Sequence, residues 1–383
     1  MRIRHVACSV FQRLTNEPSQ ARHPFTMTAP DSSPSTTDNS TTDRTSWLLD
    51  RTEALCKFDT TTGREDSGLP ALRSLLTELD AKVQLQQVEP KRHNVLATWG
   101  QPKLLFSTHL DTVPPFLPPR RNGDLLSGRG TCDAKGQITA QLAAIQELLA
   151  RGHTDLAWLG VVGEEVDSIG AHAAGDLSEN LSECIAVING EPTENKLATG
   201  QRGSLQLLLS TKGKAAHSGM PELGHSAIWP LMNWLQQLRE LKTEVDPDLG
   251  PEIWNLGLIN GGAAPNIIPA KADARLFVRS IRESSFEQRA RELMPTEGLL
   301  EQLSFTPPEV FANVPGFEHA AVPFGSDAPR LRQLVGGQRV ALCGPGTIKV
   351  AHTLDEHITG TEMATGCELL IALASTFLEG RAG

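Results

Sequence analysis

The chain has 383 residues, which exceeds the usual size of one compact domain and predicts at least two. Its 45 acidic residues outnumber 35 basic ones, for a formal net charge of -10, and no block rich in Lys or Arg occurs. This charge balance argues against a nucleic-acid partner. No apolar stretch approaches the ~20 residues needed to cross a bilayer, so no membrane partner is expected either. Small molecules are the expected ligands.

The six cysteines lie far apart and include no C-x-x-C pair. That spacing argues against a disulfide framework and against a cysteine zinc site. The opening residues, "MRIRHVACSVFQRL", carry charges where a signal peptide needs an uninterrupted apolar core. We therefore expect a cytoplasmic protein.

Residues 1–44 are dominated by Ser, Thr, Asp and Pro, as in "TAPDSSPSTTDNSTTDRT". Too few apolar groups are present to offset the entropy lost on ordering, so this segment is predicted to be a disordered tail. Translation from Met27 and a transit peptide are alternative explanations of the leader, and the first is favoured.

Helices and strands alternate from residue 46 onward. Helical apolar spacing occurs in "SWLLDRTEALCKF", "LPALRSLLTELDA" and "GQITAQLAAIQELLARG", whereas "KLLFSTHL", "LAWLGVVG" and "CIAVING" are short runs rich in strand-forming residues. Such alternation predicts an α/β fold with a mostly parallel sheet flanked by helices.

Residues 201–304 have a different pattern. Two segments, "GSLQLLLSTKGKAAHS" and "EIWNLGLINGGAAPNIIPAKADARLFVRS", are typical of paired antiparallel strands, and the helix "SAIWPLMNWLQQLRELK" lies between them. The β/α alternation returns with "VALCGPG" and a last helix, "EMATGCELLIALASTFLEG". We therefore predict a discontinuous domain, 45–200 and 305–383, split by an inserted α+β domain, 201–304.

Residue types that bind metals cluster where predicted strands end, the edge at which open α/β sheets bind ligands. Taken singly, each has an ordinary explanation: Asp133 could cap the next helix, the Glu164-Glu165 pair could be solvated, and the others could lie in turns or on the surface. A common metal site explains them all at once. The residues are His109, Asp111, Asp133, Glu164, Glu165, Glu191 and His352.

The residue types fit a pair of divalent ions. Two ions about 3.5–4 Å apart can share one carboxylate, and each is completed by another carboxylate and a histidine. Asp111, two residues after His109, can accept the other imidazole N–H. Glu164 and Glu165 would point to opposite faces of a regular strand, so at a turn one can bind metal and the other can act as general base. The expected ligands are His109, His352, Asp133, Glu165 and Glu191.

Seven motifs between about residues 47 and 379 resemble the M20 family of dinuclear zinc peptidases and deacylases. They are "STHLDTVPP", "GRGTCDAKGQ", "GEEVDSIGA", "INGEPT", "GKAAHSG", "APNIIP" and "GPGTIKVAHTLDE". Within the family, "INGEPT" and "GPGTIKVAHTLDE" are similar to the branch of acetylornithine deacetylase and succinyl-diaminopimelate desuccinylase.

The resemblance implies two Zn²⁺ ions, with Co²⁺ or Mn²⁺ as substitutes, bridged by Asp133. It implies that Glu164 is the general base and that Asp111 orients His109. The inserted domain would be a lid and dimerisation domain, whose His217 reaches the partner subunit's site and stabilises the tetrahedral intermediate. Asn266 and Arg279, and less firmly Arg202, would hold the substrate carboxylate.

The expected activity is hydrolysis of the amide bond of an N-acyl amino acid by a homodimer, in amino-acid metabolism such as arginine biosynthesis. A dipeptidase or aminopeptidase with the same metals is the first alternative, and a non-catalytic binding protein is the second. Two departures from the family pattern occur. Ala134 replaces a common Met, and "FGSDAPRL" varies a loop near the site, which leaves the substrate open. Cys132 is expected to be an inert small side chain.

Overall fold

The computed structural model describes residues 38–311, 313–336 and 339–380. Most of the predicted tail lies outside these residues. Its last part is helical, however, because α1 spans Asp38–Cys56. Arg44 on this helix forms ion pairs with Glu147 and Glu368, tertiary contacts that composition alone does not reveal. Helix α1 therefore begins within the predicted tail.

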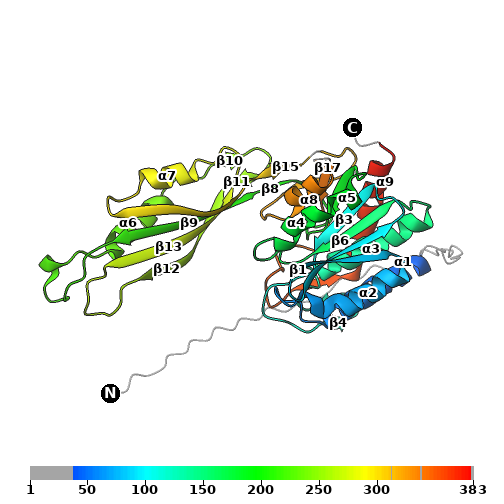
Figure 1. Cartoon of the computed structure of the whole chain (residues 1–383), viewed down its shortest axis with the longest axis horizontal. Coiled ribbons are helices and arrows are strands. Elements are labelled where there is room, and N and C mark those ends of the chain that lie inside the picture. Colours follow the sequence, from blue (N-terminus) through cyan, green and yellow to red (C-terminus); the bar gives the residue numbers. More distant parts are fainter. Residues whose placement is uncertain (1–37, 312, 337–338, 381–383) are drawn as a thin grey trace, which may run out of the picture.

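The molecule has two lobes, shown in Figure 1. The larger is built on a six-stranded sheet of order β1-β2-β6-β3-β7-β17. Its last four strands are mutually parallel, and Leu104 on β3 is level with Leu156 on β6 and Ala186 on β7. The strands are β1 (Lys82–Glu89), β2 (Arg92–Trp99), β3 (Leu104–His109), β6 (Leu156–Val161), β7 (Ala186–Asn189) and β17 (Arg339–Leu342).

Helices cover both faces of this sheet, as the predicted fold class requires. Alternate side chains of a strand point to opposite faces, so Leu104 and Phe106 join one core cluster while Leu105 joins the other. The first cluster packs under α1, α2 (Leu69–Glu78), α3 (Lys135–Ala150) and α9 (Gly360–Leu378). The second packs under α4 (Ile169–Ala173), α5 (Ser178–Leu181) and α8 (Ala328–Leu334).

Two features of the larger lobe were not expected. The β1–β2 hairpin adds an antiparallel edge to the sheet. The segment "KVQLQQVE" does not indicate a strand of this sheet, because β1 is mostly exposed and polar. Helix α9 is long and apolar enough by length and composition to span a membrane. Leu370, Ile371 and Phe377 of that helix are buried in the core of this lobe.

The smaller lobe, which we call the lid domain, contains a four-stranded antiparallel sheet of order β12-β13-β9-β14. Leu205, Leu207 and Leu209 of β9 pack against α6 (Ile228–Arg239) and α7 (Phe286–Glu292). The strands are β9 (Gly203–Lys212), β12 (Ile253–Gly261), β13 (Lys271–Ser280) and β14 (Gly298–Thr306). These elements lie in the segment predicted as an inserted α+β domain, with β14 running slightly past residue 304.

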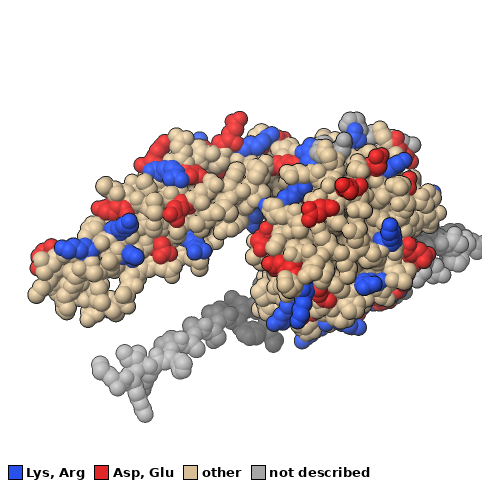
Figure 2. Space-filling view, viewed as in Figure 1, with Lys and Arg blue, Asp and Glu red and all other residues tan. Residues whose placement is uncertain are grey.

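A small sheet, β15-β8-β16, lies between the lobes, and a hairpin, β10-β11, and a three-stranded sheet, β18-β5-β4, complete the described strands. Acidic and basic side chains are interspersed over the face shown in Figure 2, without a basic stripe. The remaining strands are β4 (Arg120–Asn122), β5 (Leu125–Ser127), β8 (Leu197–Gln201), β10 (Val245–Asp246), β11 (Gly250–Pro251), β15 (Glu309–Val310), β16 (His319–Val322) and β18 (His357–Thr359).

Candidate active site

Three parallel strands deliver predicted site residues to one edge of the large sheet. His109 is the last residue of β3, and Glu191 comes two residues after the end of β7. Beyond β6, Gly163 takes a positive φ of 78°, which a residue without a Cβ adopts at little cost. The chain therefore turns at Glu164 and Glu165, so the rule of opposite strand faces no longer separates them.

Asp133 and His352 lie on loops, so the expectation that every site residue ends a strand of the main sheet is wrong. Asp133 stands in the turn before α3, and its carboxylate does not cap that helix, whose N-cap residue is Ala134. His352 lies well beyond β17 with a φ of 63°. Loop geometry, which the strand pattern does not encode, places both side chains.

Asp133 lies between the two histidines. Its Oδ1 is 2.9 Å from Nε2 of His109, and its Oδ2 is 3.4 Å from Nε2 of His352. His352 Nε2 is also 2.9 Å from Glu165 Oε2. One carboxylate thus presents a separate oxygen to each imidazole, which is the arrangement a bridging ligand requires.

These side chains form a charged cluster, in which His109 and Asp133 are buried and His352 is half exposed. Burial opposes a charge on His109, but the carboxylates of Asp111 and Asp133 outweigh it and raise the pKa of His109 well above its usual value. Hydrogen bonds donated by the imidazole to the carboxylates of Asp133 and Glu165 raise the pKa of His352 to about 10. Burial, together with neighbouring carboxylates, raises the pKa of Glu191 well above its usual value.

The donor set fits a divalent cation. Ligand atoms of His109, Asp133 and Glu165 all lie within 4.8 Å of one another, with His352 and Glu191 beside them. In the metal-free chain, protons on the imidazoles offset the crowded carboxylates, and metal binding would displace those protons. Imidazole and carboxylate are ligands that Zn²⁺ accepts.

Asp111 is fully buried, but it contacts His109 differently from the prediction. The nearest acceptor to His109 Nδ1 is the backbone carbonyl of Asp111, at 3.0 Å, whereas the carboxylate lies 3.5 Å away. The carboxylate instead accepts the backbone N–H groups of Glu164 and Glu165, at 3.1 and 3.2 Å. Asp111 therefore holds the loop that carries both glutamates, as well as facing the histidine.

Glu164 occupies a position suited to proton transfer. Burial, reinforced by the carboxylates of Asp327, Glu165 and Asp111, raises its pKa well above the usual value, although His109 opposes the shift. A carboxylate with a raised pKa is a stronger base when ionised. Cys132 does not compete as a nucleophile, because burial raises the pKa of its thiol well above the usual value.

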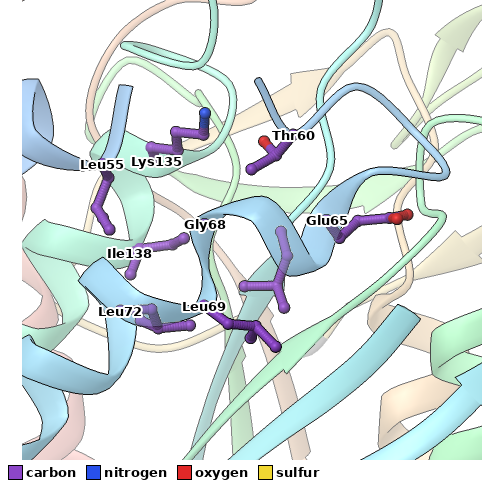
Figure 3. A pocket seen from close by; sticks show the side chains of 9 residues that line it. Leu55, Thr60, Glu65, Gly68, Leu69, Leu72, Lys135 and Ile138 are labelled. Atoms are coloured by element: carbon purple, nitrogen blue, oxygen red, sulfur yellow. The ribbon is translucent and has the colours of Figure 1, made fainter. Parts of the chain in front are cut away.

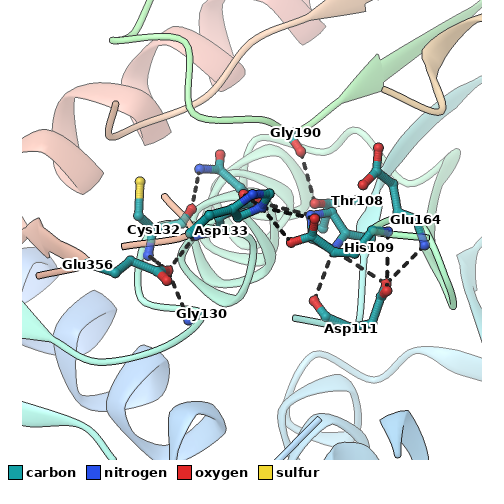
Figure 4. A network of polar contacts seen from close by, with 12 residues as sticks. Thr108, His109, Asp111, Gly130, Cys132, Asp133, Glu164, Gly190 and Glu356 are labelled. Carbon is teal, nitrogen blue, oxygen red and sulfur yellow. Dashed lines mark hydrogen bonds and ion pairs between the residues drawn. The ribbon is translucent and has the colours of Figure 1, made fainter. Parts of the chain in front are cut away.

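Glu356 is a site residue to which the sequence pattern assigned no role. Its Oε1 accepts the backbone N–H groups of Gly130, Cys132 and Asp133, as Figure 4 shows, while Oε2 pairs with Arg129. Glu356 comes four positions after His352, so this carboxylate fastens the loop of one histidine to the loop of the candidate bridging aspartate. A fully buried acid next to a predicted ligand would have been the signal, but burial is not visible in sequence.

The structure does not bring every predicted site residue together within one chain. His217 and Asn266 are exposed and adjacent, since the Ser218 N–H donates to the Asn266 carbonyl at 3.0 Å. They lie on the loops β9–α6 and β12–β13, at the end of the lid domain remote from the large lobe. Arg279 and Arg202 lie at the near end, and β13 separates Arg279 from Asn266 by roughly 25–30 Å at ~3.4 Å per residue.

Sequence relatives cover most of this chain. Residues 199–294 match a family model described as a peptidase dimerisation domain of M20 type. A peptidase M20 domain-containing protein of Schizosaccharomyces pombe is 34% identical over 331 residues, covering 83% of this chain and 82% of that protein. A probable carboxypeptidase of Aspergillus niger is 35% identical over 308 residues, covering 71% and 74%.

Solved structures share the fold at lower identity. The aminopeptidase PepT of Bacillus cereus superposes with a TM-score of 0.69 at 20% identity, covering 86% of this chain and 97% of that one. The M20 family metallo-carboxypeptidase Sso-CP2 of Sulfolobus solfataricus has a TM-score of 0.66 at 16% identity, covering 85% and 97%. With its relatives, its fold and its cluster of metal-type ligands, this chain belongs to the M20 family of metal-dependent peptidases.

Proposed function

We propose that this protein is a hydrolase for the amide bond of N-acyl amino acids, close to the acetylornithine deacetylase and succinyl-diaminopimelate desuccinylase branch. One observation carries the proposal: two arginines lie at the base of the lid domain, within electrostatic reach of each other, and Arg279 is also within reach of Glu164. An N-acyl amino acid has a free carboxylate beside its scissile amide. A guanidinium can bind that carboxylate with two parallel hydrogen bonds.

Both arginines are fixed in position, but among the described residues no carboxylate forms an ion pair with either of them. Arg202 is buried, its Nε donates to the Leu249 carbonyl at 3.0 Å, and its Nη1 has no hydrogen-bond partner among the described residues. The guanidinium carbon of Arg279 lies 4.7 Å from the centre of the Phe277 ring. A methyl group on Gly325 would lie 3.8 Å from Nη1 of Arg279, so the variant loop "FGSDAPRL" borders the same place.

The residues divide the work of amide hydrolysis. His109, Asp133, Glu165, Glu191 and His352 would hold two Zn²⁺ ions, with Co²⁺ or Mn²⁺ as substitutes. Bound cations supply Lewis-acid chemistry, stabilising negative charge on the amide oxygen. Glu164 accepts the proton of the attacking water and returns it to the departing amine. The Asp111 carboxylate keeps Glu164 in place by accepting a hydrogen bond from the backbone N–H of Glu164.

We place His217 and Asn266 in the partner subunit's site, because within one chain they lie at the remote end of the lid domain. Strand β12 is an edge of the lid sheet, and apolar side chains are exposed along it and on α6: Trp229, Met232, Leu256 and Ile259. The outer edge of such a strand, beside exposed apolar groups, is suited to pairing with a second copy. A homodimer formed there would carry two composite sites.

A peptidase is the second candidate. Relatives are named as probable carboxypeptidases, and the same arginines could bind the C-terminal carboxylate of a peptide. The two activities differ on the other side of the scissile bond. A deacylase accepts an acyl group that has no amine, whereas a dipeptidase must accept a free α-amine.

The discriminating experiment measures amine release by the zinc-loaded protein. The substrates are N-acetylornithine, N-acetylcitrulline, N-succinyl-diaminopimelate, N-blocked dipeptides and free dipeptides. Turnover of one N-acyl amino acid in preference to all peptides supports the deacylase. Preference for blocked or free dipeptides replaces it with a peptidase, and no turnover by fully metal-loaded protein contradicts both.

A further inference from the structure

We infer that Thr62, in the segment before the large sheet, is a positioning residue of the metal site. Its hydroxyl donates a 2.8 Å hydrogen bond to Oδ2 of Asp111. The inference deepens the proposed function, since it concerns how the same site is assembled.

The two oxygens of the Asp111 carboxylate have different partners. Oδ1 accepts the N–H of Glu164 and faces Nδ1 of His109 at 3.5 Å, while Oδ2 accepts the N–H of Glu165 and the hydroxyl of Thr62. A rotation of this carboxylate would loosen a metal ligand and the general base together. The Thr62 hydroxyl is the side-chain donor that resists such a rotation.

The hydroxyl is presented by a firmly anchored segment. Thr62 N–H donates to the Thr112 carbonyl at 3.2 Å, and Thr112 N–H donates to the Thr60 carbonyl at 3.2 Å. The segment is thus paired with the chain that follows Asp111. Lys135, at the start of α3, donates from Nζ to the Phe58 carbonyl at 2.8 Å.

A second anchor lies just after Thr62. Gly63 N–H donates to Glu65 at 3.0 Å, and Glu65 makes a buried two-pronged ion pair with Arg92 of β2. Glu65 is 1% exposed and Arg92 is 9% exposed, so neither solvent nor salt easily weakens this pair.

The space beneath the segment is too small for substrate. Figure 3 shows a cavity between Thr60 and the start of α3, lined mainly by apolar side chains and measuring about 20 Å³. Such a volume accepts roughly one water molecule. This cavity is therefore not a substrate pocket, and the segment supports the site structurally.

The neighbouring threonine supplies a matched control. Thr61 also carries a hydroxyl on this segment, but that hydroxyl donates to Asp59 at 2.7 Å and not to Asp111. Thr62→Val and Thr61→Val thus remove the same group one residue apart. Thr62→Ser keeps the donor.

The test measures the Zn²⁺ dissociation constant of each purified variant by competition with a chelator, together with urea unfolding of the metal-free proteins. Outer-sphere partners of metal ligands typically change affinity 10–100-fold, so Thr62→Val should weaken Zn²⁺ binding about tenfold. Thr61→Val and Thr62→Ser should bind like wild type. Because no substrate is involved, the result is independent of whether the enzyme proves to be a deacylase.

Three outcomes would overturn the inference. The first is unchanged Zn²⁺ affinity in Thr62→Val. The second is an equal loss in Thr61→Val, which would mean that the segment matters only as a whole. The third is a loss of metal-free stability in Thr62→Val large enough to account for its whole loss of Zn²⁺ affinity, which would assign the hydroxyl to folding.

Discussion

At the scale of single residues, the carboxylates of this site differ in their expected roles because their neighbours differ. Asp133 faces two imidazoles, Asp111 accepts two backbone N–H groups, and no group among the described residues donates a hydrogen bond to the Glu164 carboxylate. Opposite charges and hydrogen bonds stabilise an ionised carboxylate, whereas burial among like charges favours its protonated form. Glu164 is therefore the carboxylate best prepared to exchange a proton.

The substitution Glu164→Gln should remove this base without removing a metal ligand. We expect kcat to fall about 10²–10⁴-fold, the usual contribution of a positioned base, while bound metal stays at the wild-type level. Steady-state kinetics and metal analysis measure the two quantities.

Glu179→Gln, on the exposed surface, is the matched control and should behave like wild type. Loss of metal from Glu164→Gln would instead identify Glu164 as a ligand and make Glu165 the candidate base.

At the scale of elements, several candidate site residues lie on loops, and buried polar contacts hold these loops in place. Glu356 joins the His352 loop to the turn before α3, and Gln201 of β8 exchanges two hydrogen bonds with Ser326, at 2.7 and 3.1 Å. These contacts fasten segments that lie far apart in the sequence. Loops held in this way can place ligands as firmly as strands do.

Glu356→Gln should be strongly destabilising. Arg129 is only 1% exposed and would lose its charged partner, and breaking a buried pair typically costs about 3–5 kcal/mol. Urea unfolding of the metal-free protein measures the change in the free energy of unfolding.

The neighbouring Asp355→Asn changes an exposed carboxylate and should cost little. Equal effects of the two substitutions would show that the Glu356 pair has no special part in stability.

An ion pair at the β10–β11 hairpin is expected to make the stability of the protein depend on pH in the acidic range. Two hydrogen bonds from Arg282, each 2.8 Å long, hold the pKa of Asp246 well below its usual value of about 3.9. The folded pKa is depressed, so this stabilisation is present above about pH 4 and is lost as pH falls toward the folded pKa. Wild type should lose stability between about pH 4.5 and 2.5 more steeply than Asp246→Asn.

Unfolding free energies measured across this pH range provide the test. Glu283→Gln removes an exposed acid beside Arg282 and should keep the wild-type slope. Identical slopes for wild type and Asp246→Asn would contradict the prediction. The Leu249 carbonyl of this hairpin also accepts a hydrogen bond from Arg202, one of the two arginines in the proposed substrate site.

At the scale of the whole molecule, we propose that the site is divided between the two lobes and between two chains. Along the lid domain, the arginines lie near the large lobe, whereas His217 lies at the remote end. Complementation between defective chains tests this division. Chains carrying His217→Ala and chains carrying Glu164→Gln should each be inactive alone.

Mixed and allowed to re-associate, they should recover roughly a quarter of wild-type activity, because half of the random dimers are mixed and each mixed dimer has one intact site. Adding Ile259→Asp on the exposed β12 edge of both chains should abolish this recovery. Leu299→Asp, at a similarly exposed position on the opposite edge strand β14, should not. No recovery in the parent mixture would contradict a shared site.

The sequence by itself determined the alternation of strands and helices, the inserted domain and the residue types of the metal site. These features depend on local periodicity and on motifs of short range, such as "STHLDTVPP" and "GEEVDSIGA". The tertiary structure decided that α1 begins within the predicted tail, that Asp111 holds the glutamate loop, that Thr62 contacts Asp111, and that Glu356 joins two loops. Each of these depends on burial or on a contact between segments distant in sequence, which residue pattern alone does not specify.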